Sequence, residues 1–425
     1  MPLRLAMTDS GRAAAAASAL TVARNPARHR AFMITSLPRR SVLATAIAAS
    51  LSLLVSAPLR AEQKPSPVAG ALQPFVDSHT LAGAVTLITD KDKTLALDTV
   101  GFADIATGKR MTPDAIFWIA SMSKPITATA FMILVDEGEV SLDDPVEKYL
   151  PEFKGQKVAT GDAKTPKLEA AVHPITVRNV LSHTSGLPFK SPMEVPTLDL
   201  FPLAERVKSY AAGPLQFQPD TKYQYSNAGI NTAGRIIEVV SGMSYEKFLQ
   251  EKLFTPLGMT DTTFTPNKAQ IARIAKSYKP NAAKNGLDET TVGQLKYPLD
   301  DPSRQPMPAG GLFSTAEDLG KFCRMLLNGG QLDGRRYISE KALKTMTSKQ
   351  TGDLPTGYGL GWSVGKNPGN PFGHGGAYAT NMQVNPGAGI ATIFLVQHAG
   401  FPNGDEGKKV LPAFQKAAAE LAPKR

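Results

Sequence analysis

Segments rich in apolar and β-forming residues predict strands toward both ends of the chain. These segments are Ala82–Thr89, Thr94–Phe102, Tyr358–Val364, Thr380–Val384 and Ile390–Val396. The polar tetrapeptide Asp90-Lys91-Asp92-Lys93 joins the first two, which favours an antiparallel hairpin. Helix candidates at Val68–Ser78 and Lys408–Leu421 flank the strands. We therefore expect one sheet assembled from both ends of the chain.

Between these ends the apolar spacing is mostly helical. In Ser121–Glu137, apolar residues recur at positions 126, 130, 133 and 134, and Gly138 follows. Other predicted helices are Thr176–Ser182, Gly229–Val240, Ser244–Leu253 and one that opens with the capping box Ser314-Thr315-Ala316-Glu317 and ends near Gly329-Gly330. The pattern predicts a sheet built from both ends of the chain, with an inserted helical lobe. We expect the sheet lobe to span about 62–150 and 300–425, and the helical lobe about 151–299.

Residues 1–61 are predicted to be a leader that ends in a signal peptide. Arg39-Arg40 precedes an apolar run, Ser41–Pro58, and a neutral Ala61 follows. The paired arginines resemble a twin-arginine signal, with an ordinary Sec signal or a membrane anchor as alternatives. We expect export to the periplasm or medium, a mature chain that begins near Glu62 and keeps no membrane span, and either Met1 or Met33 as the start.

Charge and composition indicate a soluble enzyme-sized domain and give little reason to expect nucleic-acid binding. The formal charge is +10 over 425 residues. The leader holds eight Arg and Asp9, so seven of these ten charges lie there and only three in residues 62–425. Cys323 is the only cysteine, which excludes an intramolecular disulfide, and its place on the apolar side of a helix indicates core packing.

Three Ser-x-x-Lys motifs are candidates for a nucleophile with its base. Ser363-Val364-Gly365-Lys366 lies in or beside a strand, where positions three apart point to opposite faces. Ser244-Tyr245-Glu246-Lys247 is expected to begin a helix with Ser244 as its N-cap. Ser121-Met122-Ser123-Lys124 also begins a helix, and one turn places Ser121 and Lys124 on the same face. A desolvated lysine there could stay neutral and act as a base, so Ser121 is the preferred nucleophile.

Two further motifs lie downstream. Tyr225-Ser226-Asn227 is the only Tyr-x-Asn in the chain, and the Gly/Pro-containing sequence before it indicates a loop. His374-Gly375-Gly376 is expected at the start of a C-terminal strand, where glycines allow a substrate to approach the backbone closely.

In this order, the three motifs resemble the signature elements of class C β-lactamases, DD-peptidases and family VIII carboxylesterases, over roughly residues 65–400. Agreement extends to Phe117-Trp118-Ile119-Ala120, Leu181–Leu187 and Ala309–Thr315. The resemblance implies an α+β fold of the β-lactamase/transpeptidase type, with an antiparallel sheet flanked by helices and an all-helical lobe. It implies an acyl-enzyme on Ser121, with Lys124 and Tyr225 moving protons. It also implies an oxyanion hole made by the backbone N–H groups of Ser121 and Ala377. Asn227 would orient Lys124 or the substrate, and His374, Gly375 and Gly376 would contact the substrate; no metal or cofactor is implied.

The third motif departs from the Lys-Thr-Gly that is usual in β-lactamases and transpeptidases. Histidine with its ordinary pKa near 6.5 is mostly neutral at pH 7, so a substrate carboxylate would be held weakly. We therefore expect a carboxylesterase on small esters, with any β-lactam activity rising as the pH falls toward 6. A β-lactamase or D-Ala-D-Ala carboxypeptidase, and a non-catalytic binder of cell-wall peptide, are the alternatives.

Other candidate chemistry is weaker. His183 could serve as the base of a triad, although a structural role is preferred because it lies where a short helix runs into a turn. His79, His173 and His398 lack the spacing of metal ligands. The chain has no Gly-x-Ser-x-Gly, which argues against an α/β-hydrolase fold.

Overall fold

The computed structural model describes residues 66–423, apart from 163 and 366–369. The predicted leader, its cleavage site and both candidate starts therefore lie outside the described residues. Within the described part of the chain, no helix is both long and apolar enough to span a membrane.

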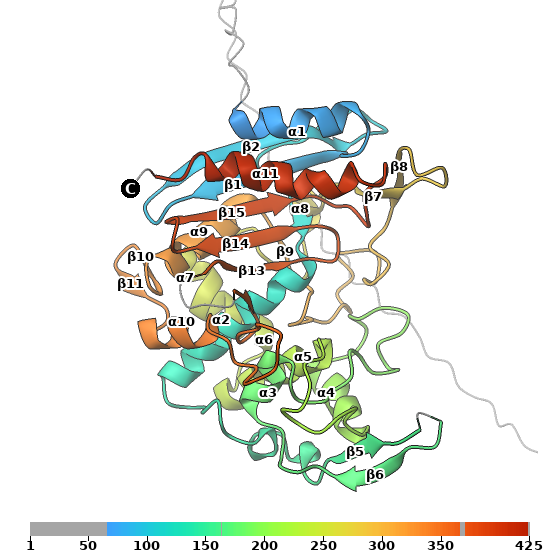
Figure 1. Ribbon diagram of the computed structural model, residues 1–425, viewed down its shortest axis with the longest axis vertical. Coiled ribbons are helices and arrows are strands. Elements are labelled where there is room, and N and C mark those ends of the chain that lie inside the picture. The colour runs from blue at the N-terminus through green and yellow to red at the C-terminus, as the bar shows by residue number, and fades with distance from the viewer. Residues whose placement is uncertain (1–65, 163, 366–369, 424–425) are drawn as a thin grey trace, which may run out of the picture. The chain divides into compact units, whose positions relative to one another are not determined.

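A seven-stranded antiparallel sheet is built from both ends of the described chain, in the order β12-β13-β14-β15-β1-β2-β3 (Figure 1). Its strands are β1 (Gly83–Thr89), β2 (Thr94–Asp104), β3 (Lys109–Arg110), β12 (Ser363–Val364), β13 (Phe372–Gly375), β14 (Asn381–Asn385) and β15 (Ile390–Leu395). The central pairing joins the two ends, with Val85 opposite Leu395 and Thr89 opposite Ala391. Short two-stranded ladders are formed by β4 (Phe117–Trp118) with β9 (Phe313–Ser314), β5 (Lys157–Thr160) with β6 (Lys167–Ala170), β7 (Ser277–Pro280) with β8 (Leu287–Thr290), and β10 (Gln331–Leu332) with β11 (Arg335–Arg336).

Helices cover both faces of this sheet. Helices α1 (Pro67–Asp77) and α11 (Val410–Ala419) pack against each other on one face, where they bury residues such as Ala84 and Ile88. Helix α9 (Ala316–Leu327) packs on β1 and β15 at the other face, over Val85 and Leu87. Because successive strand residues point to opposite faces, β1 is buried along its whole length between the two layers.

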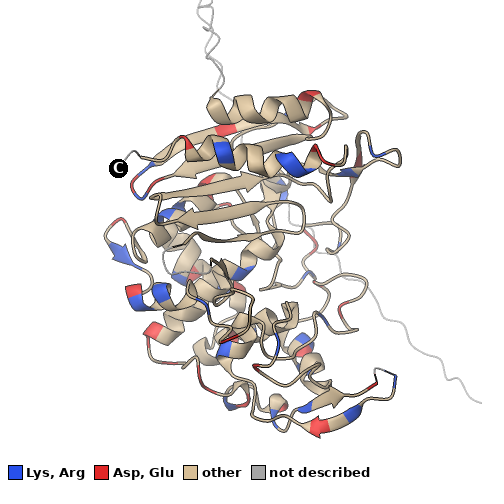
Figure 2. Cartoon of the chain, viewed as in Figure 1, with Lys and Arg blue, Asp and Glu red and all other residues tan. Residues whose placement is uncertain are grey.

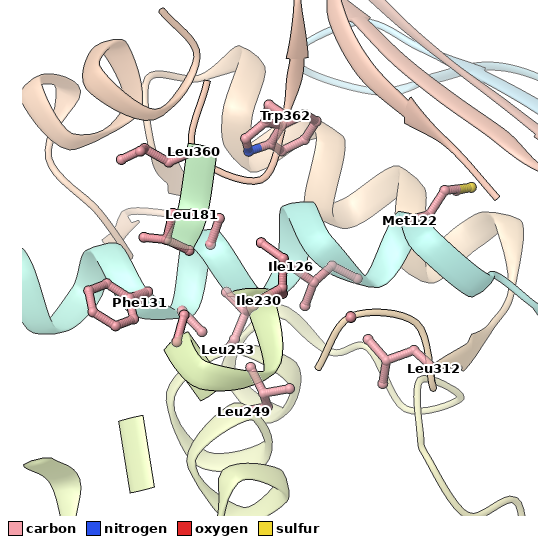
Figure 3. Close-up of a cluster of buried hydrophobic side chains, with 14 of the residues drawn as sticks. Met122, Ile126, Phe131, Leu181, Ile230, Leu249, Leu253, Leu312, Leu360 and Trp362 are labelled. Atoms are coloured by element: carbon pink, nitrogen blue, oxygen red, sulfur yellow. The ribbon is translucent and has the colours of Figure 1, made fainter. Parts of the chain in front are cut away.

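The remaining helices form the second part of the fold. They are α2 (Ser123–Asp136), α3 (Val177–Ser182), α4 (Leu203–Ala212), α5 (Asn227–Ser241), α6 (Tyr245–Leu249), α7 (Thr255–Leu257), α8 (Lys268–Ile271) and α10 (Glu340–Met346). Helix α2 is buried from Ser123 to Leu134, and its apolar side chains pack against apolar side chains of other helices and loops (Figure 3). Gly229 of α5 lies so close to α3 that an added Cβ would meet the carbonyl oxygen of Val180 at 2.7 Å. A buried α2 thus connects the sheet to the helices.

The α+β fold class is confirmed, and several element boundaries differ from the prediction. The strand expected over Tyr358–Val364 is reduced to Ser363–Val364, because Gly361 takes a φ of +70° and bends the chain. The helix expected over Ser244–Leu253 is α-helical only to Leu249 and continues as a π-turn to Phe254. The capping side chain of α9 is Thr315, which accepts a hydrogen bond from Asp318 N–H.

Charged residues of both signs are interspersed along the described chain (Figure 2). Many form local ion pairs on the surface, such as Lys148 with Asp144 and Arg178 with Asp143. Surface pairs of this kind contribute little stability individually.

Candidate active site

The turn that carries Ser121 is held between a strand and the start of α2. Strand β4 pairs with β9 and leads into a 3₁₀ turn, Ala120–Met122, that precedes α2. Ala120 has a φ of +47°, which is uncommon for a residue other than glycine. The fully buried Ser123 stabilises the turn, since its hydroxyl donates to Ala120 O (2.7 Å) and accepts from Leu312 N–H (3.2 Å). The predicted helix from Ser121 therefore starts as a tight turn that leaves Ser121 partly exposed.

Lys124 lies fully buried beneath this turn. Its Nζ is 3.1 Å from Ser121 Oγ, 2.8 Å from Asn227 Oδ1 and 2.6 Å from Ala309 O. Burial lowers the pKa of Lys124 well below its ordinary value, which favours the neutral amine. A neutral amine has two N–H bonds and one lone pair. Since Asn227 Oδ1 and Ala309 O can only accept, they take the two N–H bonds and direct the lone pair toward the Ser121 hydroxyl.

Tyr225 lies close to both Lys124 and Ser121. Its ring centroid is 4.6 Å from Lys124 Nζ, and its phenol interacts with the Ser121 side chain. Burial raises the pKa of Tyr225, so the phenol keeps its proton at neutral pH. Tyr225 precedes Ser226, whose side chain caps α5 by accepting from Gly229 N–H. The loop expected for the Tyr-x-Asn motif thus runs directly into a helix, with Asn227 as its first residue.

His183 contacts Tyr225, and within the described residues it makes no hydrogen bond to Ser121. It ends α3 in a left-handed conformation (φ 64°), and its ring centroid is 4.6 Å from that of Tyr225. Its backbone oxygen accepts from Gln224 N–H and its Nδ1 accepts from Ser226 N–H, so it holds the chain on both sides of Tyr225. Burial lowers its pKa well below the ordinary value. These contacts agree with the structural role preferred for His183.

His374 lies at the end of β13, which corrects the expected position at the start of a strand. It pairs with Met382 of β14, and the turn follows Gly375. His374 Nδ1 is 2.7 Å from Gly375 O, so Nδ1 carries the proton, and Nε2 accepts from the Tyr358 hydroxyl at 3.1 Å. Burial lowers the pKa of His374 to about 3. The expected partial protonation near pH 6 is therefore wrong, because the ring is buried and both nitrogens already have partners.

The two glycines after His374 differ in their surroundings. A Cβ on Gly376 would lie 2.1 Å from Thr380 Oγ1 and 2.5 Å from Ile119 O, so only glycine allows this turn to pack against the residues before Ser121. A Cβ on Gly375 would meet nothing closer than 3.6 Å. The next residue, Ala377, is exposed, and no acceptor for its backbone N–H lies among the described residues. The backbone N–H of Ala377 is therefore available to an external acceptor.

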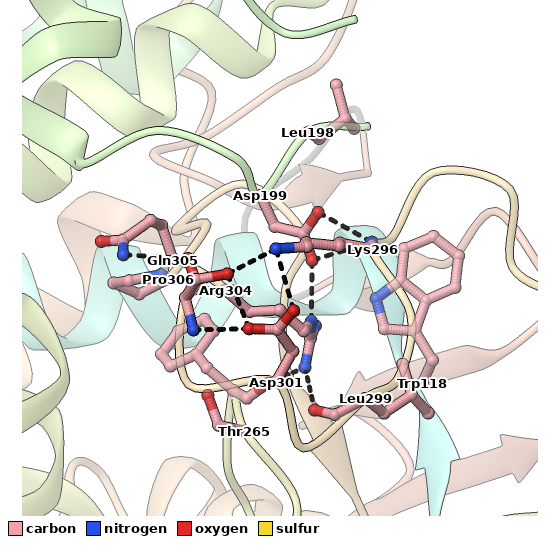
Figure 4. Close-up of polar contacts among 12 residues, drawn as sticks. Trp118, Leu198, Asp199, Thr265, Lys296, Leu299, Asp301, Arg304, Gln305 and Pro306 are labelled. Carbon is pink, nitrogen blue, oxygen red and sulfur yellow. Dashed lines mark hydrogen bonds and ion pairs between the residues drawn. The ribbon is translucent and has the colours of Figure 1, made fainter. Parts of the chain in front are cut away.

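A buried ion pair fixes the loop that leads to Ala309 (Figure 4). Arg304 Nε donates to Asp199 Oδ2 at 2.8 Å, and Arg304 also donates to the carbonyl oxygens of Phe264 and Leu299. Asp199 also accepts from Lys296 N–H at 2.9 Å. Since both charges of the pair are almost fully buried, removing either one would leave an unpaired buried charge. The loop therefore has little freedom where it approaches Lys124.

A model of the Beta-lactamase family matches residues 68–413. The chain belongs to the β-lactamase family. Penicillin-binding protein 4 of Amycolatopsis lactamdurans is 32% identical over 331 residues, which cover 75% of this chain and 81% of that protein. Esterase EstB of Burkholderia gladioli is 27% identical over 311 residues, 67% of this chain and 74% of that protein. The solved structure of EstCE1, a hydrolase with promiscuous acyltransferase activity, has the same fold, with a TM-score of 0.69 at 22% identity over 83% of this chain and 97% of that one.

Proteins of the β-lactamase family are serine hydrolases, and the relatives of this chain include esterases and carboxypeptidases.

The other two Ser-x-x-Lys motifs and the cysteine are not part of the site around Ser121. Ser244 is the N-cap of α6, as predicted, and Ser363 lies on the edge strand β12, while Lys366 is outside the described residues. Cys323 is fully buried, and burial raises the pKa of its thiol. Within the described residues, no group of three or more His, Cys, Asp and Glu side chains could hold a metal ion.

Sequence reasoning missed three groups of this β-lactamase-family site. Tyr358 binds His374, and Ala309 O binds Lys124. Phe189 is 45% exposed and stacks on Tyr225, with ring centroids 6.3 Å apart. The Ala309-Gly310-Gly311 segment was visible as a family marker, but its carbonyl contact with Lys124 depends on tertiary packing.

Proposed function

We propose that this protein is a serine carboxylesterase that forms an acyl-enzyme on Ser121. The observation that carries the choice of substrate is the neutral His374, which binds Gly375 O and Tyr358 and stands where related enzymes usually have a lysine. Without a cation at this position, a substrate carboxylate loses a charge-assisted hydrogen bond, which is roughly twice as strong as a neutral one. An uncharged ester loses nothing by this replacement.

The first half-reaction transfers the acyl group to Ser121. Neutral Lys124 accepts the hydroxyl proton while Ser121 Oγ attacks the ester carbonyl, and the C–O bond to the alcohol then breaks. The proton passes to the leaving alkoxide through Lys124 and the protonated phenol of Tyr225, both of which lie against Ser121 Oγ. Asn227 keeps Lys124 oriented during this transfer. In the second half-reaction, water replaces the alcohol and the same groups move protons in the reverse direction.

The negative charge that develops on the carbonyl oxygen needs N–H donors. We assign this role to the backbone N–H groups of Ser121 and Ala377. Support comes from the tight packing of Gly376 against Ile119 and Ala120, which holds the turn with Ala377 next to the turn with Ser121. Preorganised donors of this type are worth about 10²–10³ in rate for each donor removed.

The exposed aromatic ring of Phe189 supports an apolar substrate. It stacks on Tyr225, so an acyl or aryl group bound near Ser121 can pack against it. We therefore propose small aryl and alkyl esters as the substrate class.

Hydrolysis of 4-nitrophenyl acetate and butyrate, of nitrocefin and of D-Ala-D-Ala peptides tests this proposal. We expect kcat/KM for the esters to exceed that for nitrocefin by at least about two powers of ten. The variant His374→Lys should shift this ratio toward the carboxylate-bearing substrates. Efficient nitrocefin turnover without ester hydrolysis would instead support the alternative, a β-lactamase or D-Ala-D-Ala carboxypeptidase. Absence of turnover and of covalent labelling would support a non-catalytic binder.

We also propose that the protein is exported through its N-terminal leader. The support is the sequence pattern of Arg39-Arg40, the apolar run and Ala61. N-terminal sequencing of the exported protein should find a start near Glu62, and Arg39-Arg40→Lys-Lys should block export by the twin-arginine route. Unaffected export of that variant would leave a Sec signal, and an intact membrane-bound N-terminus would contradict cleavage.

A further inference from the structure

Helix α5 supports Lys124 at two points, one turn apart. Asn227 accepts directly from Lys124 Nζ. Asn231 is fully buried, and its Oδ1 accepts from Ala309 N–H at 3.1 Å. Ala309 O is the other acceptor of Lys124, at 2.6 Å. The backbone of Ala309 is thus held through its N–H by Asn231, while its carbonyl oxygen, in the next peptide group, accepts from Lys124.

The side chain of Asn231 is itself fixed by a buried polar chain. Its Nδ2 donates to the Tyr210 hydroxyl at 3.0 Å, and this hydroxyl donates to Glu194 Oε1 at 2.7 Å. Glu194 also accepts from Ser191 N–H at 2.9 Å. Tyr210 and Glu194 are each about 1% exposed, so their hydrogen bonds do not compete with water.

A second buried residue ties the same loop to this chain. Arg206 lies 3.9 Å from Glu194 and donates to the carbonyl oxygens of Leu198 and Pro306. Pro306 is three residues before Ala309. The loop that carries Pro306 and Ala309 is therefore bound to this buried hydrogen-bond network at two places, through Arg206 and through Asn231.

We infer that Asn231 is a positioning residue for Lys124, on which it acts through the backbone of Ala309. This inference rests on the proposed roles of Ser121 and Lys124. A neutral lysine directs its lone pair at Ser121 only while both of its N–H bonds have fixed acceptors. Asn227 supplies one of them, and Asn231 keeps the other in place. Loss of Asn231 removes the acceptor that holds the backbone of Ala309, so the carbonyl oxygen of Ala309 can shift and the amine can turn away from the hydroxyl, without loss of any group that touches the substrate.

The test compares Asn231→Leu with Thr232→Val, a matched control on the same helix. Thr232 is also fully buried, but its hydroxyl donates only within the helix, to Ala228 O at 2.8 Å. We expect Asn231→Leu to lower kcat for 4-nitrophenyl butyrate and the rate of fluorophosphonate labelling by about 10- to 100-fold, with KM changed by less than about threefold. Thr232→Val should keep both rates near those of the parent protein at a similar cost in melting temperature.

Tyr210→Phe provides a graded variant, because it removes the acceptor of Asn231 Nδ2 and leaves the contact between Asn231 and Ala309. We expect a loss of about 3- to 10-fold in kcat, and no further loss when it is added to Asn231→Leu, since both act through one chain. If Asn231→Leu does not fold, Asn231→Ser replaces it, because a serine hydroxyl is too short to reach Ala309 N–H and the same loss is expected.

The outcomes separate this inference from the proposed function. Failure of fluorophosphonate to label the parent protein at Ser121 would overturn the proposed function itself. Labelling of the parent at Ser121, with an unchanged rate in a folded Asn231 variant, would overturn only the positioning role. Failure of both Asn231 variants to fold, while Thr232→Val folds, would assign Asn231 to stability and also overturn the positioning role.

Discussion

Ser121 lies beside two groups, Lys124 and Tyr225, whose charged forms are disfavoured by burial. Desolvation disfavours the charged form of either group, so the pKa of Lys124 falls and the pKa of Tyr225 rises. Burial therefore favours an amine lone pair on Lys124 and a retained phenol proton on Tyr225. This difference supports the proposed roles, in which Lys124 is the base and Tyr225 a proton donor.

The first prediction concerns this pair. Lys124→Ala and Tyr225→Phe should each lower kcat/KM by several powers of ten, since each removes one part of a single proton path. Because the two residues act as a unit, the double variant should lose clearly less than the product of the two single losses. Steady-state kinetics with an activated ester measure the loss of kcat/KM in the two single variants and in the double variant. Losses that multiply in full would show that the two residues do not share a path.

At the scale of elements, the site lies where the end of β13 meets the turn before α2. Gly376 makes this approach possible, and Gly375 does not contribute to it sterically. The second prediction follows. Gly376→Ala should lower kcat by at least about tenfold, because the added methyl group overlaps backbone and displaces both turns.

Gly375→Ala is the matched control for this prediction. It adds the same atom one residue earlier, where the nearest neighbour is 3.6 Å away, so activity should stay within about threefold of the parent. Steady-state kinetics and melting temperatures of both variants show whether the steric fit of Gly376 is needed for activity. Equal effects of the two substitutions would contradict the assigned packing of Gly376.

The sequence could predict contacts between residues that are close together in the chain, but not contacts between distant segments. Ser121 and Lys124 are one helical turn apart, so their proximity required no knowledge of tertiary structure. The strand at Tyr358 was wrong because Gly361 adopts a positive φ, which a run of β-forming residues does not reveal. The neutral state of His374 was expected from its ordinary pKa, but its depth of burial and its bond to Tyr358 come from packing between distant segments. The contact of Ala309 with Lys124 spans 185 residues and was not predictable from spacing.

At the scale of the whole molecule, buried histidines make stability depend on pH. Burial lowers the pKa of His374 to about 3 and that of His398 to about 4, from an ordinary 6.5. As the pH falls below 6.5, the unfolded chain binds protons that the folded chain excludes. The free energy of unfolding should therefore fall with decreasing pH, by up to about 1.4 kcal/mol per pH unit for each of these residues.

The third prediction isolates His398, whose Nε2 accepts from Ala82 N–H. In His398→Gln, which keeps an acceptor but cannot titrate, the free energy of unfolding should fall less steeply than in the parent between pH 6.5 and 4.5. Urea unfolding across this range measures the slope. An unchanged slope in His398→Gln would contradict the burial of a neutral His398.

Ser121 is the proposed nucleophile, and its neighbour Ser123 offers a comparison within the same turn. Ser123 is fully buried and its hydroxyl is engaged by Ala120 and Leu312, whereas Ser121 is partly exposed and faces Lys124. Peptide mapping by mass spectrometry after reaction with a fluorophosphonate measures directly which hydroxyl reacts. We predict one adduct, on Ser121, that is lost in Ser121→Ala and retained in Ser244→Ala and Ser363→Ala. An adduct on Ser123, or labelling that persists in Ser121→Ala, would contradict it.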